Sequence, residues 1–279
     1  MGGDFTSLRS KVLFYLFIVL FIFLTLFPLL WVLKLSIISQ AELQRSPPTI
    51  FPHSLSFASY GRVFANGSFT KGIINSFVIA GFTTVICLAV GSIAAYALAR
   101  IKFSFQLPVS SLILAIAFFP AVAIIAPLFL QFTRMGLVNT YWAMILPDTL
   151  LSLPLTVYLL VAYFRELPAS IEEAAKVDGA GTLQTFWRVT LPLSIPGVVT
   201  TGLLTFIFAW NEFLFANTFA FDASTQPATV VIPLFASQFT TDYGAQAAAS
   251  IIVTLPLVIL VFLFQRRIVS GLTAGATSG

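Results

Sequence analysis

The sequence has few charged residues, one cysteine and one histidine. Of its 279 residues 9% are charged and 58% are hydrophobic, whereas a soluble domain has about a quarter charged residues. A chain this apolar is expected to be an integral membrane protein. The single cysteine, Cys87, excludes an internal disulfide. The single histidine, His53, lies in a proline-rich loop where nothing nearby could complete a metal site, so no metal is expected.

Sequence motifs of catalysis are also missing. The chain has no glycine-rich phosphate loop ending in Gly-Lys-Ser/Thr and no nucleophile constellation. We therefore expect no catalytic residues, and uphill transport would need energy from another subunit. The net charge of +4 comes from basic residues placed singly or in pairs between apolar runs. This distribution is typical of membrane topology signals and argues against nucleic-acid binding.

Six apolar runs are each long enough to cross the ~30 Å hydrocarbon layer of a bilayer. They predict an all-α membrane protein with six spans, at residues 12–33, 72–99, 108–133, 141–164, 193–217 and 245–264. A cleaved signal peptide is the alternative for the first run, but its apolar core is too long and no clear cleavage site follows. Prolines in most of the runs predict packed and bent spans.

The basic residues indicate the orientation of these spans. With cytoplasmic termini, nine Lys and Arg residues lie inside: Arg9, Lys11, Arg100, Lys102, Arg165, Lys176, Arg188, Arg266 and Arg267. Five lie outside: Lys34, Arg45, Arg62, Lys71 and Arg134. The positive-inside rule therefore favours cytoplasmic N and C termini. The predicted organisation is a cytoplasmic tail 1–11, a six-span domain 12–268 with outer loops 34–71 and 218–243 and a cytoplasmic loop 165–192, and a cytoplasmic tail 269–279.

The polar stretch 170–192 is predicted to form a two-turn helix between spans four and five. Ser170 is a candidate N-cap with Glu173 completing a capping box, and Glu172 with Lys176 forms an i, i+4 pair. Gly179 supplies a flexible helix end. One face has small residues, which would let another surface approach closely, so we expect a docking element. The alternative is an amphipathic helix resting on lipid headgroups, but the apolar face of this segment is small and the segment has too few basic residues.

Two acidic residues fall within the predicted spans. Asp148 follows Pro147 in the fourth span, and Glu212 follows Trp210 and Asn211 near the outer end of the fifth. An ionisable residue inside a span is a candidate functional residue. Both lie near enough to the outer interface to be wetted, so a structural hydrogen-bonding role is equally open.

Two sets of residues resemble a known family. The pattern Glu173-Ala174-Ala175-x-x-x-Gly179, then nine residues and Val189-x-Leu191-Pro192, resembles the "EAA" loop of permease subunits of bacterial ABC importers, which usually have Ile at the position of Val189. Segments 209–216 and 264–276 resemble the maltose-type (MalG-like) permeases of carbohydrate importers. The resemblance covers nearly the whole chain and is weakest at 36–70.

The resemblance implies that a coupling helix docks into a cytoplasmic ATPase subunit, whose ATP-driven closure opens the membrane cavity outward. The implied coupling residues are Glu172, Glu173, Ala174, Ala175, Asp178, Gly179, Leu191 and Pro192. Separately from the resemblance, Asn211 and Glu212 are candidate pathway-lining residues, because Glu212 is an ionisable residue within a predicted span. The C-terminal residues Ser270, Gly271, Leu272 and Thr273 are implied to contact the ATPase pair. The chain itself would need no cofactor, because ATP and Mg are bound by the partner ATPase subunits.

The same resemblance implies the partners and the location. Expected partners are a second homologous permease subunit, two cytoplasmic ATP-binding subunits, an extracytoplasmic sugar-binding protein and the lipid bilayer of a bacterial inner membrane. The outer loop 218–243 is implied to contact the binding protein through Phe221, Thr225, Gln226 and Pro227, with a plain connecting loop as the alternative.

The expected substrate is an α-linked disaccharide such as maltose or trehalose. Glycosylated osmolytes and glycerol 3-phosphate are alternatives, although the spans have no basic residue at depth to favour a phosphate ester. A self-sufficient secondary carrier is a further alternative. Carriers typically show two matching halves with interrupted helices, and we find no such repeat in the sequence.

Overall fold

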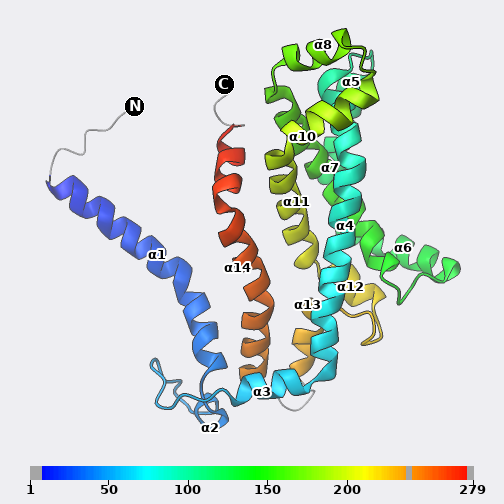
Figure 1. The fold of residues 1–279 in the computed structure, drawn as a ribbon. Helices are drawn as coiled ribbons and strands as arrows, with labels where there is room; N and C mark the ends of the chain where they lie inside the picture. The colour runs from blue at the N-terminus through cyan, green and yellow to red at the C-terminus, as the bar shows by residue number, and fades with distance from the viewer. Residues whose placement is uncertain (1–7, 237–240, 275–279) are drawn as a thin grey trace. The chain divides into compact units, whose positions relative to one another are not determined.

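The computed structural model describes residues 8–236 and 241–274. Within these residues the regular structure is helical, apart from two isolated β-bridges (Figure 1). The prediction of an all-α membrane protein is confirmed. The chain divides into two units, one formed by 1–67 with 232–254 and the other by 68–231 with 255–279.

The first unit contains the N-terminal helix and short helices that follow it. Its helices are α1 (Leu8–Ser36), α2 (Gln40–Leu43), α3 (Ala58–Ala65), η2 (Ile232–Phe235) and the first part of α14 (Tyr243–Ala274). An ion pair between Arg62 and Asp242, with Nε and Oδ2 2.7 Å apart, joins α3 to the start of α14. The outer loop 34–71 predicted from the sequence therefore contains two short helices.

The second unit contains the remaining helices. They are α4 (Gly67–Arg100), α5 (Gln106–Ala117), α6 (Ala121–Met135), α7 (Trp142–Glu166), α8 (Ala169–Val177), α9 (Thr182–Thr185), the π-helix η1 (Phe186–Thr190), α10 (Leu191–Leu193), α11 (Ile195–Trp210), α12 (Leu214–Phe219) and α13 (Ala228–Val231). Figure 1 shows α4, α7 and α11 running alongside one another, with α8 at one end of this bundle.

Four helices are long and apolar enough to cross a membrane, at Ser10–Ser36, Gly67–Arg100, Trp142–Glu166 and Tyr243–Gln265. Two further candidates are bent pairs of helices, so the described residues provide up to six spans if each pair counts as one. This number agrees with the six apolar runs of the sequence, while two of the runs have an unexpected shape.

The predicted third span, 108–133, is broken rather than continuous. Helices α5 and α6 meet at an angle of 87°, and Pro120 is the N-cap of α6. A proline lacks the backbone N–H and disfavours the helical conformation of the residue before it, so α5 ends at Ala117 and a new helix starts after the proline. Pro127, in contrast, lies inside α6.

The predicted fifth span, 193–217, is also corrected. Its helix α11 ends at Trp210, and residues 214–219 form the separate helix α12. At its other end α11 is preceded by α9 to α10, which lie at 78° to it. The acidic Glu212 therefore lies between α11 and α12 and not inside a helix.

The core of the second unit lies where α4, α7 and α11 pack together. The hydroxyl groups of Thr156 on α7 and Thr205 on α11 are hydrogen-bonded at 2.9 Å. Gly197 allows α11 to approach α7, because a Cβ atom there would lie 2.4 Å from Cγ of Tyr163. This close packing holds the helix ends next to residues 165–192, the candidate coupling loop.

Candidate functional site

Helix α8 is the candidate coupling helix, and its N-terminal cap differs from the prediction. It begins at Ala169 with Pro168 as N-cap, and no side chain makes a capping hydrogen bond to the first backbone N–H groups of the helix. The capping box of Ser170 and Glu173 is therefore wrong, because Pro168 already fixes the extended entry to the helix and the helix starts one residue early. The predicted glycine stop is confirmed, since Gly179 adopts a left-handed φ of 86° directly after the helix.

Glu172 is buried on the inner side of α8. Its Oε1 atom lies 2.9 Å from Nε of Arg100, at the end of α4. The same oxygen accepts a hydrogen bond from Thr190 Oγ1 at 3.0 Å, and Oε2 accepts one from the Tyr96 hydroxyl at 3.4 Å. The predicted pair with Lys176 is wrong, because the carboxylate points into the protein instead of along the helix surface.

Arg100 connects two parts of the coupling loop. Besides its ion pair with Glu172, its Nη2 donates to the carbonyl oxygen of Leu167 at 2.7 Å. Leu167 is the C-cap of α7, so one guanidinium holds both the end of α7 and the helix that follows. The local sequence gave no signal for this arrangement, because the partners come from different helices.

An aromatic cluster lies beneath this polar contact. Tyr96 of α4, Phe164 of α7 and Phe186 of η1 are buried together, with the rings of Tyr96 and Phe186 5.0 Å apart. The π-helix η1 follows Thr185, and its last residue is Thr190, which bonds to Glu172. Single π-helical turns are frequent at functional sites. Here the turn joins the coupling loop to the bundle core.

The outer side of the coupling loop is open. Glu173, Ala174 and Asp178 are exposed, Ala175 and Leu191 are half-buried, and Pro192 is exposed. Three large apolar side chains that the sequence analysis did not single out, Val177, Leu183 and Trp187, are also exposed, Val177 by 87%. A polar loop that shows several apolar side chains beside small residues has the composition of a protein-binding surface.

The two acids that the sequence analysis could not separate have different surroundings. Glu212 accepts hydrogen bonds from the backbone N–H groups of Phe215 at 2.8 Å and Ala216 at 3.1 Å, so it stabilises the start of α12. Asn211 beside it is exposed. Asp148 is buried in α7, and within 8–236 and 241–274 neither of its carboxylate oxygens has a hydrogen-bond partner. The hydrogen bonds to Phe215 and Ala216 therefore give Glu212 a structural role at the start of α12.

The segment 221–227 is built around Asn139, a residue that the sequence analysis missed. Asn139 has a left-handed φ of 62°, and its Oδ1 accepts hydrogen bonds from Phe221 N at 3.1 Å and Thr225 Oγ1 at 2.8 Å. Thr225 and Pro227 are buried and Gln226 is half-buried, while Phe221 is exposed. Of the four residues expected to contact a binding protein, Phe221 is the one that is exposed, and Gln226 is partly accessible.

The remaining predicted site lies at the C terminus. The backbone of Ser270 to Thr273 continues α14, which ends at Ala274. The side chains of these four residues lie outside the described part of the chain, as do residues 237–240 of the loop 218–243.

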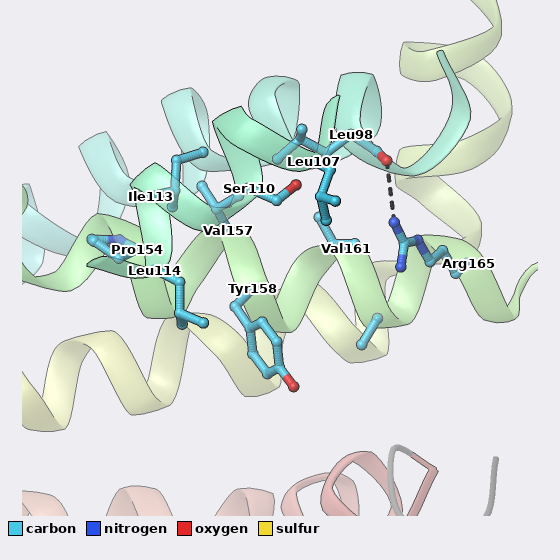
Figure 2. Close-up of a pocket in the computed structure, with 11 residues that line it drawn as sticks. Leu98, Leu107, Ser110, Ile113, Leu114, Pro154, Val157, Tyr158, Val161 and Arg165 are labelled. Carbon is cyan, nitrogen blue, oxygen red and sulfur yellow. Dashed lines mark hydrogen bonds between the residues drawn. The ribbon is translucent and has the colours of Figure 1, made fainter. Parts of the chain in front are cut away.

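A cavity of about 310 Å³ lies between α5 and α7, beside the end of α4. Figure 2 shows its mainly apolar lining, with the Arg165 guanidinium at one end and Ser110 between Ile113 and Leu107. Arg165 Nη2 donates to the Leu98 carbonyl oxygen at 3.5 Å. The break between α5 and α6 was not predicted, and neither was this cavity.

Comparison with known proteins identifies the family. Residues 87–273 match the family described as "Binding-protein-dependent transport system inner membrane component". A trehalose transport system permease protein of Mycobacterium tuberculosis is 40% identical over 91% of this chain and 93% of its own length. A sulfoquinovosyl glycerol transport system permease protein of Agrobacterium fabrum is 38% identical over 91% and 89%. A trehalose/maltose transport system permease protein of Thermococcus litoralis is 37% identical over 97% and 98%.

A solved structure shows the same fold. It is a bacterial ABC transporter involved in the import of the acidic polysaccharide alginate, with a TM-score of 0.80 and 23% sequence identity over 95% of this chain and 99% of that one. The family model and the relatives agree with the resemblance found in the coupling loop. The chain is a member of the binding-protein-dependent ABC transporter permeases, the non-catalytic, multi-pass components of the inner membrane.

Proposed function

We propose that the chain is the permease subunit of a sugar importer and that its loop 165–192 couples it to a cytoplasmic ATPase. The observation that supports this most directly is the division of the two adjacent acids on α8. Glu172 is buried against Arg100, while Glu173 is exposed beside Ala174. A coupling element needs one face fixed to the membrane bundle and another free for its partner, and α8 has both.

The free surface suits a protein partner. It combines the small side chains of Ala174 and Ala175 with the exposed Val177, Leu183 and Trp187. Small residues allow close approach of the partner, and an exposed tryptophan is a residue type often central to binding energy. The proposed complex contains two ATPase subunits, a second homologous permease subunit and an extracytoplasmic binding protein, with both termini of this chain in the cytoplasm.

The coupling proposal is tested by changing the charge on the free face, by reversal at Glu173 and by introduction of an acid at Gly179. Glu173→Lys and Gly179→Asp should abolish uptake and reduce co-purification of the ATPase in mild detergent, while the chain still inserts. Glu166→Lys is a matched control for Glu173→Lys, because it makes the same charge change at an exposed position at the end of α7, outside α8. Normal uptake by both coupling variants would refute the proposed docking.

The proposed orientation has its own test. A cysteine placed at Glu173 should resist a membrane-impermeant maleimide added to intact cells and react after the cells are opened. The native Cys87 is buried and should not compete for the reagent. Labelling of the variant from outside would contradict a cytoplasmic coupling loop.

We further propose an α-linked disaccharide as the substrate, because two relatives above are named for trehalose or maltose transport. A sulfoquinovosyl glycerol permease is equally similar, so glycosylated small molecules are the principal alternative. The complex purified with its binding protein should show ATPase activity stimulated by trehalose or maltose. Stimulation by a glycosylated glycerol alone would support the alternative.

For the binding-protein contact we propose Phe221 and its neighbours. Thr225 and Pro227 are buried, so deleting them would disturb the fold as well as the contact. Phe221→Ala changes a side chain that is 62% exposed. It should lower the stimulation of ATPase activity by the loaded binding protein while leaving the basal activity unchanged. Unchanged stimulation would argue for a plain connecting loop.

A further inference from the structure

The loop between α2 and α3, residues 44–57, is folded around a buried acid. Glu42 is 5% exposed, and its Oε1 accepts hydrogen bonds from Thr49 Oγ1 at 2.9 Å and the His53 backbone N–H at 3.0 Å. Its Oε2 accepts one from the Ser54 backbone N–H at 3.4 Å. The His53 bond contributes most to holding the pKa of Glu42 below its usual range. The ionised carboxylate thus joins both sides of the loop.

The base of this loop is closed as well. Ile38 and Leu55 form an antiparallel bridge, and the Ser56 N–H donates to the Ile37 carbonyl oxygen at 2.7 Å. Prolines 47, 48 and 52 restrict the backbone on both sides of the tip. Residues 50–51 therefore form a tip whose two flanks are held in place.

This tip presents two large apolar side chains to the surroundings. Ile50 is 73% exposed and Phe51 is 79% exposed. A single exposed apolar residue is ordinary, but a fixed loop with two adjacent ones at its tip has the features of an interaction site. The nature of the partner follows from where the tip is attached.

The loop is attached to the end of the first membrane helix. The Lys34 ammonium donates a hydrogen bond to the Thr49 carbonyl oxygen. Lys34 is the first charged residue after the uncharged run 12–33, which is about 33 Å long at 1.5 Å per residue and so matches the hydrocarbon layer. The same ammonium lies 4.3 Å from the ring centroid of Trp31. A tryptophan beside a lysine at the end of an apolar helix is typical of the membrane–water boundary.

Ile50 and Phe51 are one and two residues beyond the carbonyl group held by Lys34. A fully extended chain rises at most about 7 Å over two residues, which is comparable with the thickness of the headgroup region on one side of a bilayer. The tip is thus confined to the depth at which apolar and aromatic side chains enter the boundary between headgroups and acyl chains.

We propose that Ile50 and Phe51 insert into the lipid interface of the leaflet at the C-terminal end of α1, so that the loop 44–57 anchors this helix end at the membrane surface. Lipid is favoured over a soluble protein as the partner because the tether to Lys34 fixes the depth of the tip. The buried Glu42 is the positioning residue, since it holds the loop in the shape that exposes both side chains.

The test is depth-dependent quenching in the full-length protein. The Phe51→Cys variant is labelled with an environment-sensitive fluorophore and reconstituted in nanodiscs. The label should attach at position 51 alone, because the native Cys87 is buried. Lipids with a nitroxide at acyl position 5 should quench the label several-fold more than lipids with a nitroxide at position 12. Leu29→Cys, on the exposed side of α1, is the membrane reference, and Gln44→Cys, in the same loop outside the tip, is the matched control.

Two results would overturn the proposal. One is quenching at position 51 no stronger than at position 44. The other is a blue shift of the label that requires addition of the purified binding protein, which would assign the tip to a protein contact. Ile50→Cys gives the same measurement if the label at position 51 prevents insertion. Neither outcome depends on ATPase docking, so failure here leaves the proposed function unaffected.

Discussion

The contact between Glu172 and Arg100 permits a quantitative prediction. Glu172→Gln removes the negative charge and preserves the shape of the side chain, so Arg100 keeps its charge without its ionic partner. The substituted amide oxygen can still accept from Thr190, and Arg100 keeps its bond to the Leu167 carbonyl oxygen. The variant should therefore fold and insert, with α8 less firmly held.

The expected cost of Glu172→Gln follows from the burial of the ion pair. The side chains of Arg100 and Glu172 are 15% and 8% exposed, so solvent screens the pair only weakly. Removing one partner of a buried ion pair costs about 3–5 kcal/mol. Because part of the hydrogen bonding survives, we expect the lower end, about 3 kcal/mol, which corresponds to a roughly 100-fold easier opening of α8.

Hydrogen exchange measures this opening directly. Backbone amides of 169–177 should exchange roughly 100-fold faster in Glu172→Gln than in the wild type when exchange reports the opening equilibrium. Glu173→Gln is the matched control, since its exposed side chain should leave the rate unchanged. The double variant Arg100→Gln/Glu172→Gln should lose less of the free energy that holds α8 closed than the two single variants lose together. The reason is that no buried charge is then left without its partner. Equal exchange in Glu172→Gln and Glu173→Gln would refute the anchoring role.

Three further changes test other parts of the structure. Gly179→Ala places a side chain at a left-handed φ of 86°, which should cost about 1–2 kcal/mol and weaken ATPase co-purification. Gly197→Ala puts Cβ 2.4 Å from the Tyr163 ring and should lower the melting temperature through overpacking of about 1–3 kcal/mol. Burial alone would raise the pKa of Asp242, but hydrogen bonds from Arg62 and the Ala245 amide outweigh it and lower the pKa. A lowered pKa gives stability that is present above the unfolded value of about 4 and is lost as the pH falls through the folded value, so wild-type melting should fall more between pH 6 and pH 3 than that of Asp242→Asn.

Much of the fold was predictable because membrane spans leave a strong local signal. Twenty or so apolar residues in a row indicate a helix whatever surrounds them, since backbone groups in lipid must bond within their own segment. The candidate coupling helix α8 was also visible, because it is a short polar segment between two apolar runs and is followed by Gly179. These features depend on residues close together in the sequence.

Whether a proline ends a helix or lies inside it could not be predicted from the sequence. Several prolines were expected to bend helices, yet Pro127, Pro147 and Pro154 lie inside α6 and α7, whereas the chain turns by 87° at Pro120. Each proline removes one hydrogen bond, and the packing of neighbouring helices decides whether the helix continues. That packing cannot be deduced from one apolar run.

The partner of Glu172 was missed for a related reason. Local rules offer Lys176, four residues along the same helix, and a solvent-exposed pair of this kind contributes little. The actual partner, Arg100, comes from a helix far away in the sequence. In the sequence Arg100 was a topology signal, and only the folded bundle brings its guanidinium to the coupling loop.

The environments of Glu172 and Glu173 explain how so short a helix could transmit force. A nine-residue helix has too few internal hydrogen bonds to be stable alone, so a partner pulling on it would unwind or detach it unless it were fastened elsewhere. Glu172 fastens it to α4 through Arg100 and to η1 through Thr190. A displacement applied at Glu173 must then move the ends of these helices as well. On this argument the residue that determines coupling strength lies behind the proposed docking surface, and its contacts can be weakened without altering any residue proposed to contact the ATPase.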